Sequence, residues 1–354
     1  LRESCLSCLL ASQTGHALIP SMLRFLRNLV LLAFLAVACA VGGGYWLATT
    51  PVGLRTSPLD FTIATGSSLR TAAQQVSDAG VELPPLMLVI LGRLNRVESQ
   101  IKAGSYEVSA GITPIELLKK LTRGDVSQAE LAFIEGWTFR QMREKLDAHP
   151  DIRHDTRGLG EAEVLQRIGA TGQSAEGLFF PDTYLFSKRS SDLEILARAH
   201  RAMRRHLDRE WSLKADGLPY KEPYQALSMA PIVEKETGRE IDRPMIASVF
   251  VNRLRMGMLL QTDPTVIYGM GERFDGNIRK RDLLTDTPYN TYTRAGLPPG
   301  PIAMPGLASL RAALNPARSD ALYFVARGDG TSQFSRTLDE HNQAVLRYQK
   351  GGKR

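Results

Sequence analysis

The chain has 354 residues, of which 43% are hydrophobic and 23% charged, and its formal net charge is +7. This length allows two or three domains, and the composition is that of a globular protein. The charge suits an anionic partner such as membrane lipid, nucleic acid or acidic cell wall, without choosing among them. Cys5 and Cys8 form a lone Cys-x-x-Cys and Cys39 lies in an apolar run, which argues against a zinc site and excludes a thiol nucleophile or a disulfide framework further along.

The N-terminal region combines an extension with one long apolar run. Residues 1–21 show no periodicity and are interpreted as an upstream leader, with Met22 as the expected start. From Leu29 to Ala48 the chain is uncharged and almost wholly apolar, about the 20 residues that a membrane-spanning helix needs. A cleaved signal peptide is the alternative, but the run is longer than a typical signal core. We therefore predict that residues 22–50 form a cytoplasmic stub and a transmembrane anchor.

Positive charge precedes this run. Two arginines precede it, Arg24 and Arg27. Because positively charged flanks stay on the cytoplasmic side, we expect the N-terminus in the cytoplasm and the bulk of the chain exported. A nucleic-acid partner is therefore not expected, and the basic helix predicted over residues 193–211 is interpreted as a solvated face.

One pattern occurs three times, with alternating apolar residues, a glycine, a Ser or Thr and then an amphipathic run. The copies begin at Phe61, Tyr106 and Leu131. Each predicts a strand, a glycine turn, a hydroxyl N-cap and a helix. Such units loosely resemble the LysM glycan-binding module, and a plain small α+β domain is the alternative. We predict a LysM-like subdomain over residues 51–130 and a mixed helical, catalytic domain over residues 131–354.

A helix predicted from Pro223 carries two carboxylates with different surroundings. At 100° per residue, Glu236 shares its arc with apolar residues of the same helix, whereas Glu234 lies about 200° away. The apolar residues on that arc are Ala226, Met229, Ile232 and Val233. Desolvation favours the protonated carboxyl group, which is the condition that a general acid needs near neutral pH. The alternative is that Glu236 only caps the helix or pairs with a neighbouring arginine.

The same helix has two special residues. Pro231 lies within it and should kink it, because proline removes one backbone hydrogen bond. Gly238 follows Glu236 closely and predicts a left-handed end to the helix. Glu236 is therefore expected at a helix end, open to a cleft.

Polar loops follow a second helix, which is predicted from an Asp242 N-cap to Met256. Asp263, just before a proline, is interpreted first as the N-cap of a short helix. Residues 287–292 and 296–302 are predicted loops with groups that suit sugar hydroxyls and N-acetyl groups. A β-hairpin around Gly328-Asp-Gly330 and a helix over residues 338–350 complete the predicted α+β fold.

Several catalytic motifs are absent from the sequence. There is no His-Glu-x-x-His, the six histidines are scattered, and no phosphate-binding loop occurs. No convincing Gly-x-Ser-x-Gly or Ser-x-x-Lys supports a serine hydrolase or a transpeptidase. We therefore expect neither a metal nor another cofactor.

Five blocks in this order resemble the endolytic murein transglycosylases of the YceG/MltG family. They are Ile232-Val-Glu-Lys-Glu-Thr237, Ala247-Ser-Val-Phe-Val-Asn-Arg-Leu254, Leu260-Gln-Thr-Asp-Pro-Thr-Val-Ile-Tyr-Gly269, Tyr289-Asn-Thr-Tyr292 and Gly296-Leu-Pro-Pro-Gly-Pro-Ile-Ala303. The resemblance implies an inner-membrane protein with a LysM-like subdomain and an exported catalytic domain that cleaves nascent glycan strands beside peptidoglycan synthases. The family's catalytic glutamate corresponds to Glu236. Pro231 and the leader depart from the family pattern.

The implied reaction breaks the β-1,4 bond between N-acetylmuramic acid and N-acetylglucosamine without water, leaving a 1,6-anhydro end. Glu236 would be the acid/base, and a second group of residues would shape the sugar sites. That group is Gln261, Asp263, Tyr289, Asn290 and Tyr292. Two alternatives stay open: a muramidase that uses Asp263 as its second carboxylate, and a non-catalytic cell-wall adaptor of the synthases.

Overall fold

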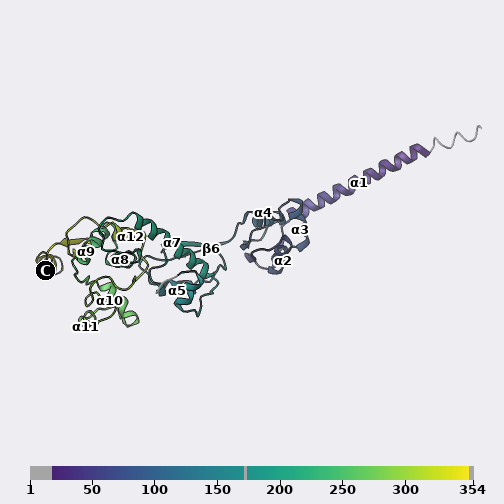
Figure 1. Ribbon diagram of the computed structural model, residues 1–354. Coiled ribbons are helices and arrows are strands. Elements are labelled where there is room, and N and C mark those ends of the chain that lie inside the picture. The colour runs from purple at the N-terminus through teal and green to yellow at the C-terminus, as the bar shows by residue number, and fades with distance from the viewer. Residues whose placement is uncertain (1–17, 171–173, 351–354) are drawn as a thin grey trace, which may run out of the picture. The chain divides into compact units, whose positions relative to one another are not determined.

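The structure, a computed structural model, describes residues 18–170 and 174–350 (Figure 1). The chain divides into two compact units, the first ending at Ser127 and the second beginning at Gln128. Both mix helices with short antiparallel strands, as predicted for an α+β protein. The predicted leader lies outside the described residues, except that residues 18–21 already belong to the first helix.

Helix α1 (Leu18–Thr49) contains the predicted anchor. Its stretch Arg24–Thr49 is long and apolar enough to cross a membrane. Large apolar side chains along it are exposed, including Phe34 and Trp46, whereas Ala48 in the last turn is buried in the core of the first unit. This helix therefore fits a single-pass membrane anchor that leads directly into folded structure.

The first unit is built from two antiparallel strand pairs and three helices. Strand β1 (Gly53–Leu54) pairs with β3 (Val81–Glu82), and β2 (Leu59–Ile63) pairs with β4 (Gly104–Val108). The helices are α2 (Leu69–Ala79), α3 (Pro85–Leu94) and α4 (Pro114–Arg123). They enclose a core that includes Phe61, Leu88 and Tyr106. The likeness of this unit to a LysM module stays a prediction.

The three predicted strand–turn–helix repeats are present. Ser68, Thr113 and Thr138 are the N-caps of α2, α4 and α5 (Phe139–Asp147), and the hydroxyl of each accepts the backbone N–H of the third residue of its helix. This satisfies one of the amide groups that the first turn of a helix leaves unpaired. The third repeat belongs to the second unit, where β5 (Gln128–Ala132) pairs with β6 (Thr183–Ser187).

The second unit is mainly helical. Its other helices are α6 (Glu161–Arg167), α7 (Asp192–Ser212), α8 (Pro223–Glu236), α9 (Arg243–Arg255), α10 (Asp263–Met270), α11 (Lys280–Leu284), α12 (Leu307–Leu314) and α13 (Leu338–Val345). Short 3-10 turns are η1 (Glu240–Asp242) and η2 (Gly271–Arg273). The predicted hairpin is confirmed as β7 (Tyr323–Ala326) with β8 (Ser332–Ser335). The predicted last helix is α-helical only to Val345 and continues as the π-turn η3 (Leu346–Lys350).

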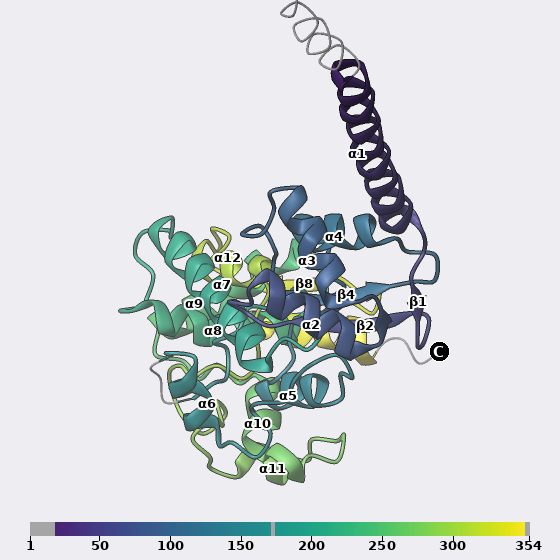
Figure 2. The ribbon, with the colours of Figure 1, turned by 90° about the vertical axis from the view of Figure 1, so that its right-hand side faces the viewer.

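Helix α8 forms the centre of this unit. It packs against α7, α9 and α12, which Figure 2 shows grouped together, with α10 and α11 below them. The arc that the helical wheel assigned to Glu236 is fully buried, including Met229, Ile232 and Val233. Burying each such side chain contributes about 1.5–3 kcal/mol. This packing fixes the direction in which the C-terminal end of α8 points.

Candidate active site

The two glutamates at the end of α8 have separate roles. The Oε1 atom of Glu234 accepts a hydrogen bond from Nη2 of Arg243 at 2.6 Å, and its Oε2 accepts one from the backbone N–H of Gly306 at 3.1 Å. The Glu234 side chain is only 7% exposed. The arginine pairing that was considered for Glu236 therefore belongs to Glu234, which ties α8 to the starts of α9 and α12.

Glu236 meets a hydroxyl group instead of a cation. Its Oε1 accepts a short hydrogen bond from Oγ1 of Thr262. Burial raises the pKa of Glu236, and the Thr262 hydrogen bond opposes this shift. The charge of Asp263 also raises that pKa, while Arg253 lowers it. This half-buried carboxyl group is therefore protonated more readily than a glutamate in water.

Arg253 lies near Glu236 but its donors are used elsewhere. Its Nε donates to the carbonyl of Leu322 at 2.7 Å, and its Nη1 donates to the carbonyl of Leu260 at 2.6 Å. Because the guanidinium group is held by backbone carbonyls, it contributes charge to the site without forming an ion pair with Glu236. A directly paired arginine would keep the carboxylate ionised.

The end of α8 differs from the prediction. Thr237 leaves the helix in an extended conformation, with φ −151° and ψ 136°. Gly238 is not among the glycines with positive φ, so the predicted left-handed helix end is wrong. The extended exit lets the Thr237 hydroxyl accept from the N–H of Arg239 at 3.0 Å, and Glu236 becomes the last helical residue.

The segment that carries Thr262 is attached to the Tyr289–Tyr292 loop. Gln261 has φ +52°, a left-handed conformation that is uncommon for a residue other than glycine. Its N–H donates to the carbonyl of Thr291 at 3.1 Å, and the N–H of Thr262 donates to Oγ1 of Thr291 at 3.1 Å. This backbone turn directs the Thr262 hydroxyl toward Glu236. The Gln261 side chain itself is exposed.

Asp263 is not an N-cap. Thr262 occupies the N-cap position of α10, and Asp263 is the first helical residue. One oxygen of the Asp263 carboxylate, Oδ1, accepts a hydrogen bond from the hydroxyl of Tyr292 at 2.6 Å. Burial raises the pKa of Tyr292, and the bond to Asp263 raises it further. Two of the predicted site residues thus meet at the side of Glu236.

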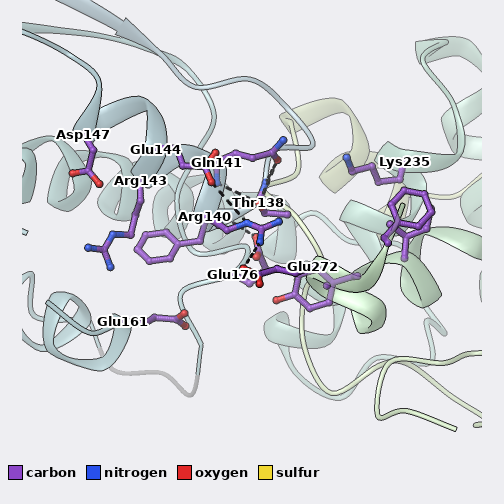
Figure 3. Close-up of a pocket in the computed structure, with 15 residues that line it drawn as sticks. Thr138, Arg140, Gln141, Arg143, Glu144, Asp147, Glu161, Glu176, Lys235 and Glu272 are labelled. Carbon is purple, nitrogen blue, oxygen red and sulfur yellow. Dashed lines mark hydrogen bonds and ion pairs between the residues drawn. The ribbon is translucent and has the colours of Figure 1, made fainter. Parts of the chain in front are cut away.

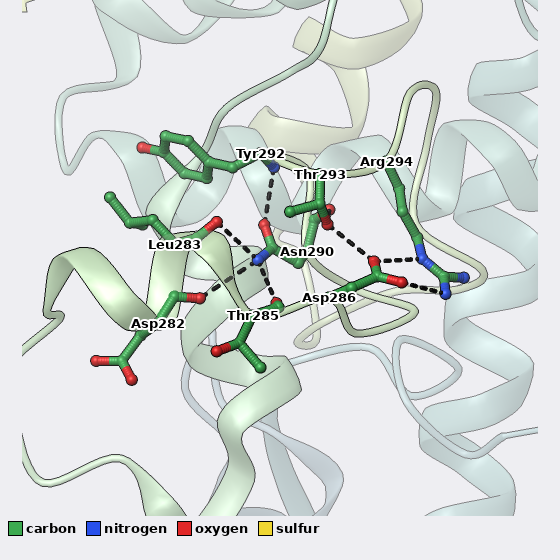
Figure 4. Close-up of polar contacts among 8 residues, drawn as sticks. All are labelled: Asp282, Leu283, Thr285, Asp286, Asn290, Tyr292, Thr293 and Arg294. Atoms are coloured by element: carbon green, nitrogen blue, oxygen red, sulfur yellow. Dashed lines mark hydrogen bonds and ion pairs between the residues drawn. The ribbon is translucent and has the colours of Figure 1, made fainter.

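Asn290 organises its own loop. Its side chain is only 1% exposed, and Nδ2 donates to the carbonyls of Asp282, Leu283 and Thr285 at 3.3, 3.1 and 2.7 Å (Figure 4). Its Oδ1 accepts the N–H of Tyr292 at 2.8 Å. The amide is fully used within the protein, so Asn290 positions Tyr292 and is not placed to bind a sugar directly.

A large groove opens beside this site. It has a volume of about 1110 Å³ and lies between the α5 region, the end of α8 and the α10 region (Figure 3). The residues that line it include Arg143, Asp147, Glu161, Glu176, Lys235 and Tyr268. Glu236 is not itself on this lining, but its neighbour Lys235 is. The groove lining thus reaches the last turn of α8, in which Glu236 is the residue after Lys235.

Glu176 is a second carboxyl group with an unusual environment. It is buried, accepts the N–H of Phe139 at 3.0 Å and is hydrogen-bonded to Tyr268. Burial raises the pKa of Glu176 to about 7. The ring of Tyr268 also packs edge-on against Tyr289, with centroids 4.7 Å apart. Tyr289 thus contacts Tyr268, which lines the groove, without lining the groove itself.

The sequence did not single out Thr262, Glu176 or Lys235. Thr262 stands in the block that holds Asp263, and Lys235 stands between the two glutamates of the Glu-Lys-Glu segment. Glu176 precedes Phe179 and Tyr184, which are buried core residues. A possible metal cluster of Asp147, His154 and Asp192 also occurs, but Asp192 already accepts hydrogen bonds from Thr156 and so anchors a loop.

Comparison with known proteins identifies the family. The YceG-like family matches residues 61–347. An endolytic murein transglycosylase of Bacillus subtilis (strain 168) is 34% identical over 268 residues, which cover 71% of this chain and 74% of that protein. A protein of the same name from Streptococcus pneumoniae is 27% identical over 320 residues, and the chain spans 57% of its length. The crystal structure of a YceG-like protein from Listeria monocytogenes matches with a TM-score of 0.51 and 32% identity, covering 81% of this chain and 99% of that one. The chain therefore belongs to the YceG-like family.

Proposed function

We propose that this protein is a lytic transglycosylase of peptidoglycan in which Glu236 is the general acid and base. The observation that carries the proposal is the environment of Glu236: a half-buried carboxyl group whose pKa is raised and whose hydrogen-bond partner is a hydroxyl group. The relatives named endolytic murein transglycosylase support the same activity.

One carboxyl group suffices for this reaction. Protonated Glu236 donates its proton to the oxygen that joins N-acetylmuramic acid to N-acetylglucosamine, and the β-1,4 C–O bond breaks. The resulting carboxylate then takes the proton from the C6 hydroxyl of the muramic acid as that oxygen bonds to the anomeric carbon. The product is a 1,6-anhydro end, and Glu236 returns to its protonated form.

Asp263 bears on the alternative of a muramidase. It is close enough to raise the pKa of Glu236, and Tyr292 orients its carboxylate. In that role Asp263 would activate a water molecule or attack the sugar, and the product would be a reducing end. The chemical nature of the product end therefore separates the two reactions.

We further propose the cellular setting. Arg24 and Arg27 before the apolar part of α1 support a cytoplasmic N-terminus in the bacterial inner membrane, with the second unit exported. There it would cut nascent strands beside peptidoglycan synthases and end their elongation. The first unit would hold glycan in the manner of a LysM module.

The test is digestion of defined glycan strands by the full chain and by Glu236→Gln, with product ends identified by mass spectrometry. The wild type should release anhydro ends, and Glu236→Gln should lose roughly 10²- to 10⁴-fold in rate, the usual contribution of a general acid. Glu240→Gln, which changes an exposed carboxylate nearby, is the matched control and should keep its rate. Reducing ends would favour the muramidase, and full activity of Glu236→Gln would refute the role of Glu236.

A further inference from the structure

Charged side chains line the groove on two sides. Lys235 lies on one side, and Figure 3 shows Asp147 and Glu161 on the opposite side, with Arg143 beside them and Arg140 between the two sides. The Lys235 amine lies over the turn at Gly136, where an added Cβ would be 3.6 Å from Nζ. Within the described parts of the chain, no carboxylate forms an ion pair with Lys235. One side of the groove thus offers an uncompensated cation.

The opposite side offers a carboxylate oxygen. Oε1 of Glu161 accepts the N–H of Ala175 at 2.5 Å, which holds the side chain at the groove and leaves its other oxygen for a ligand. Asp147 also lines this side, but its Oδ1 is buried, so that oxygen is not open to a ligand. Arg143 stands close by, but its guanidinium group donates to the carbonyls of Leu159 and Thr156. Among the described residues Arg143 therefore forms no ion pair with Glu161 or Asp147, although its charge remains on this side of the groove.

Such a charge pattern does not suit a bare glycan. A sugar chain is recognised by stacking surfaces and by neutral donors and acceptors, and it gains little from separated charges. A short peptide with a carboxylate near its attachment point and an amine further out would match both sides. In peptidoglycan, muramic acid carries a peptide stem of this kind, with an acidic residue followed by a diamino acid.

We propose that this groove binds the peptide stem of the substrate. The stem carboxylate pairs with Lys235, and the side-chain amine of the diamino acid pairs with Glu161. This rests on the proposed function and adds to it: the enzyme recognises the peptide as well as the sugar, and Lys235 couples stem binding to the position of the adjacent Glu236.

The test compares stem-bearing strands whose amines are free with the same strands after acetylation, which removes the positive charge. Acetylation should raise KM of the wild-type full chain roughly three- to tenfold, the range for a partly exposed charged hydrogen bond. Glu161→Gln keeps the acceptor for Ala175 but loses the charge. This variant should raise KM for free-amine strands by a similar factor and should no longer respond to acetylation.

Glu163→Gln removes a carboxylate from the same helix that pairs with Arg167 outside the groove, and its KM should match that of the wild type for both substrates. The proposal is overturned if acetylation leaves the wild-type KM unchanged, or if Glu161→Gln responds to acetylation as the wild type does. Failure of the proposed function would look different, because the wild type would then cut neither substrate.

Discussion

Glu236 occupies a position that favours catalysis at the expense of stability. Its pKa is raised in the folded protein, so the folded state binds this proton more tightly than the unfolded state does. Folding stability contributed by this group is therefore lost as the pH rises from the ordinary glutamate pKa through the raised one. A neutral side chain of the same shape escapes this penalty.

We therefore expect Glu236→Gln to be more stable than the wild type at pH 8. The midpoint of thermal unfolding should rise by roughly 2–4 °C, the effect of about 1 kcal/mol in a domain of this size. The difference should vanish near pH 4, where the wild-type carboxyl group is protonated. Scanning calorimetry at both pH values measures it. A lower midpoint at pH 8 would mean that the ionised Glu236 stabilises the fold.

Thr262 affects the pKa of the same carboxyl group. Its hydrogen bond lowers the pKa of Glu236, against the larger effect of burial. Because the protonated carboxyl group starts the proposed reaction, kcat/KM should fall as the pH rises through the pKa of Glu236. Removing the hydroxyl group in Thr262→Val should move this fall to higher pH. Thr262→Ser keeps a hydroxyl group and should restore the wild-type profile.

The pH profiles of kcat/KM for the wild type, Thr262→Val and Thr262→Ser distinguish a change in the pKa of Glu236 from a simple loss of the position of its side chain. If Thr262→Val lowers the rate equally at every pH, Thr262 only places the side chain of Glu236. If the profile moves to lower pH, the assigned direction of the hydrogen-bond effect is wrong. With either result Glu236 would remain the proposed acid, but the Thr262 hydrogen bond would not lower its pKa.

At the scale of elements, the loop from α11 to Tyr292 depends on one amide. Asn290 joins three backbone carbonyls to the N–H of Tyr292 (Figure 4). Replacing it with alanine leaves these partly buried groups without their partner, which costs roughly 1–3 kcal/mol. Asn290→Asp should cost more at neutral pH, since a carboxylate facing three carbonyls has no proton to donate.

Urea unfolding of Asn290→Ala, Asn290→Asp and the wild type measures these differences. Ala295→Ser, an exposed change a few residues further along the chain, is the control and should stay near the wild type. Because Tyr292 holds Asp263, both Asn290 variants should also raise KM for glycan strands. Stability equal to the wild type in Asn290→Ala would show that water satisfies the carbonyls and that the loop does not depend on this amide.

The elements also explain what could be predicted from the sequence. The three hydroxyl N-caps and the buried arc of α8 are local patterns, and a single stretch of chain contains all the information that they need. Glu236 was proposed as the acid in this way. The partner of Glu236 is not local: Thr262 reaches it only because Gln261 adopts a left-handed turn and Thr291 holds that turn in place.

Interactions between distant segments account for the errors. Asp263 has the sequence features of an N-cap, but the hydroxyl of Tyr292 holds its carboxylate and Thr262 precedes the helix. Asn290 has the chemistry of a sugar ligand, yet burial turns its amide inward. Glu176 gave no signal because its surroundings come from α5 and α10, which no periodicity connects to it.

At the scale of the whole molecule, the two units have separate cores. The core of the first contains Phe61, Leu88 and Tyr106, and those of the second contain residues from Leu131 onward. The groove and Glu236 with its partners all belong to the second unit. Catalysis should therefore not require the first unit or α1, whereas delivery to the membrane and to nascent strands should require them.

We predict that a protein of residues 128–354 folds and cuts soluble glycan strands with the kcat of the full chain, because every residue of the proposed chemistry is retained. It should fail to sediment with vesicles and should raise KM for long strands if the first unit binds glycan. Rates on short and long strands, with vesicle sedimentation of both proteins, measure these effects. A folded fragment that cannot cut short strands would place part of the active site in the first unit, and unchanged KM on long strands would remove glycan binding from that unit's role.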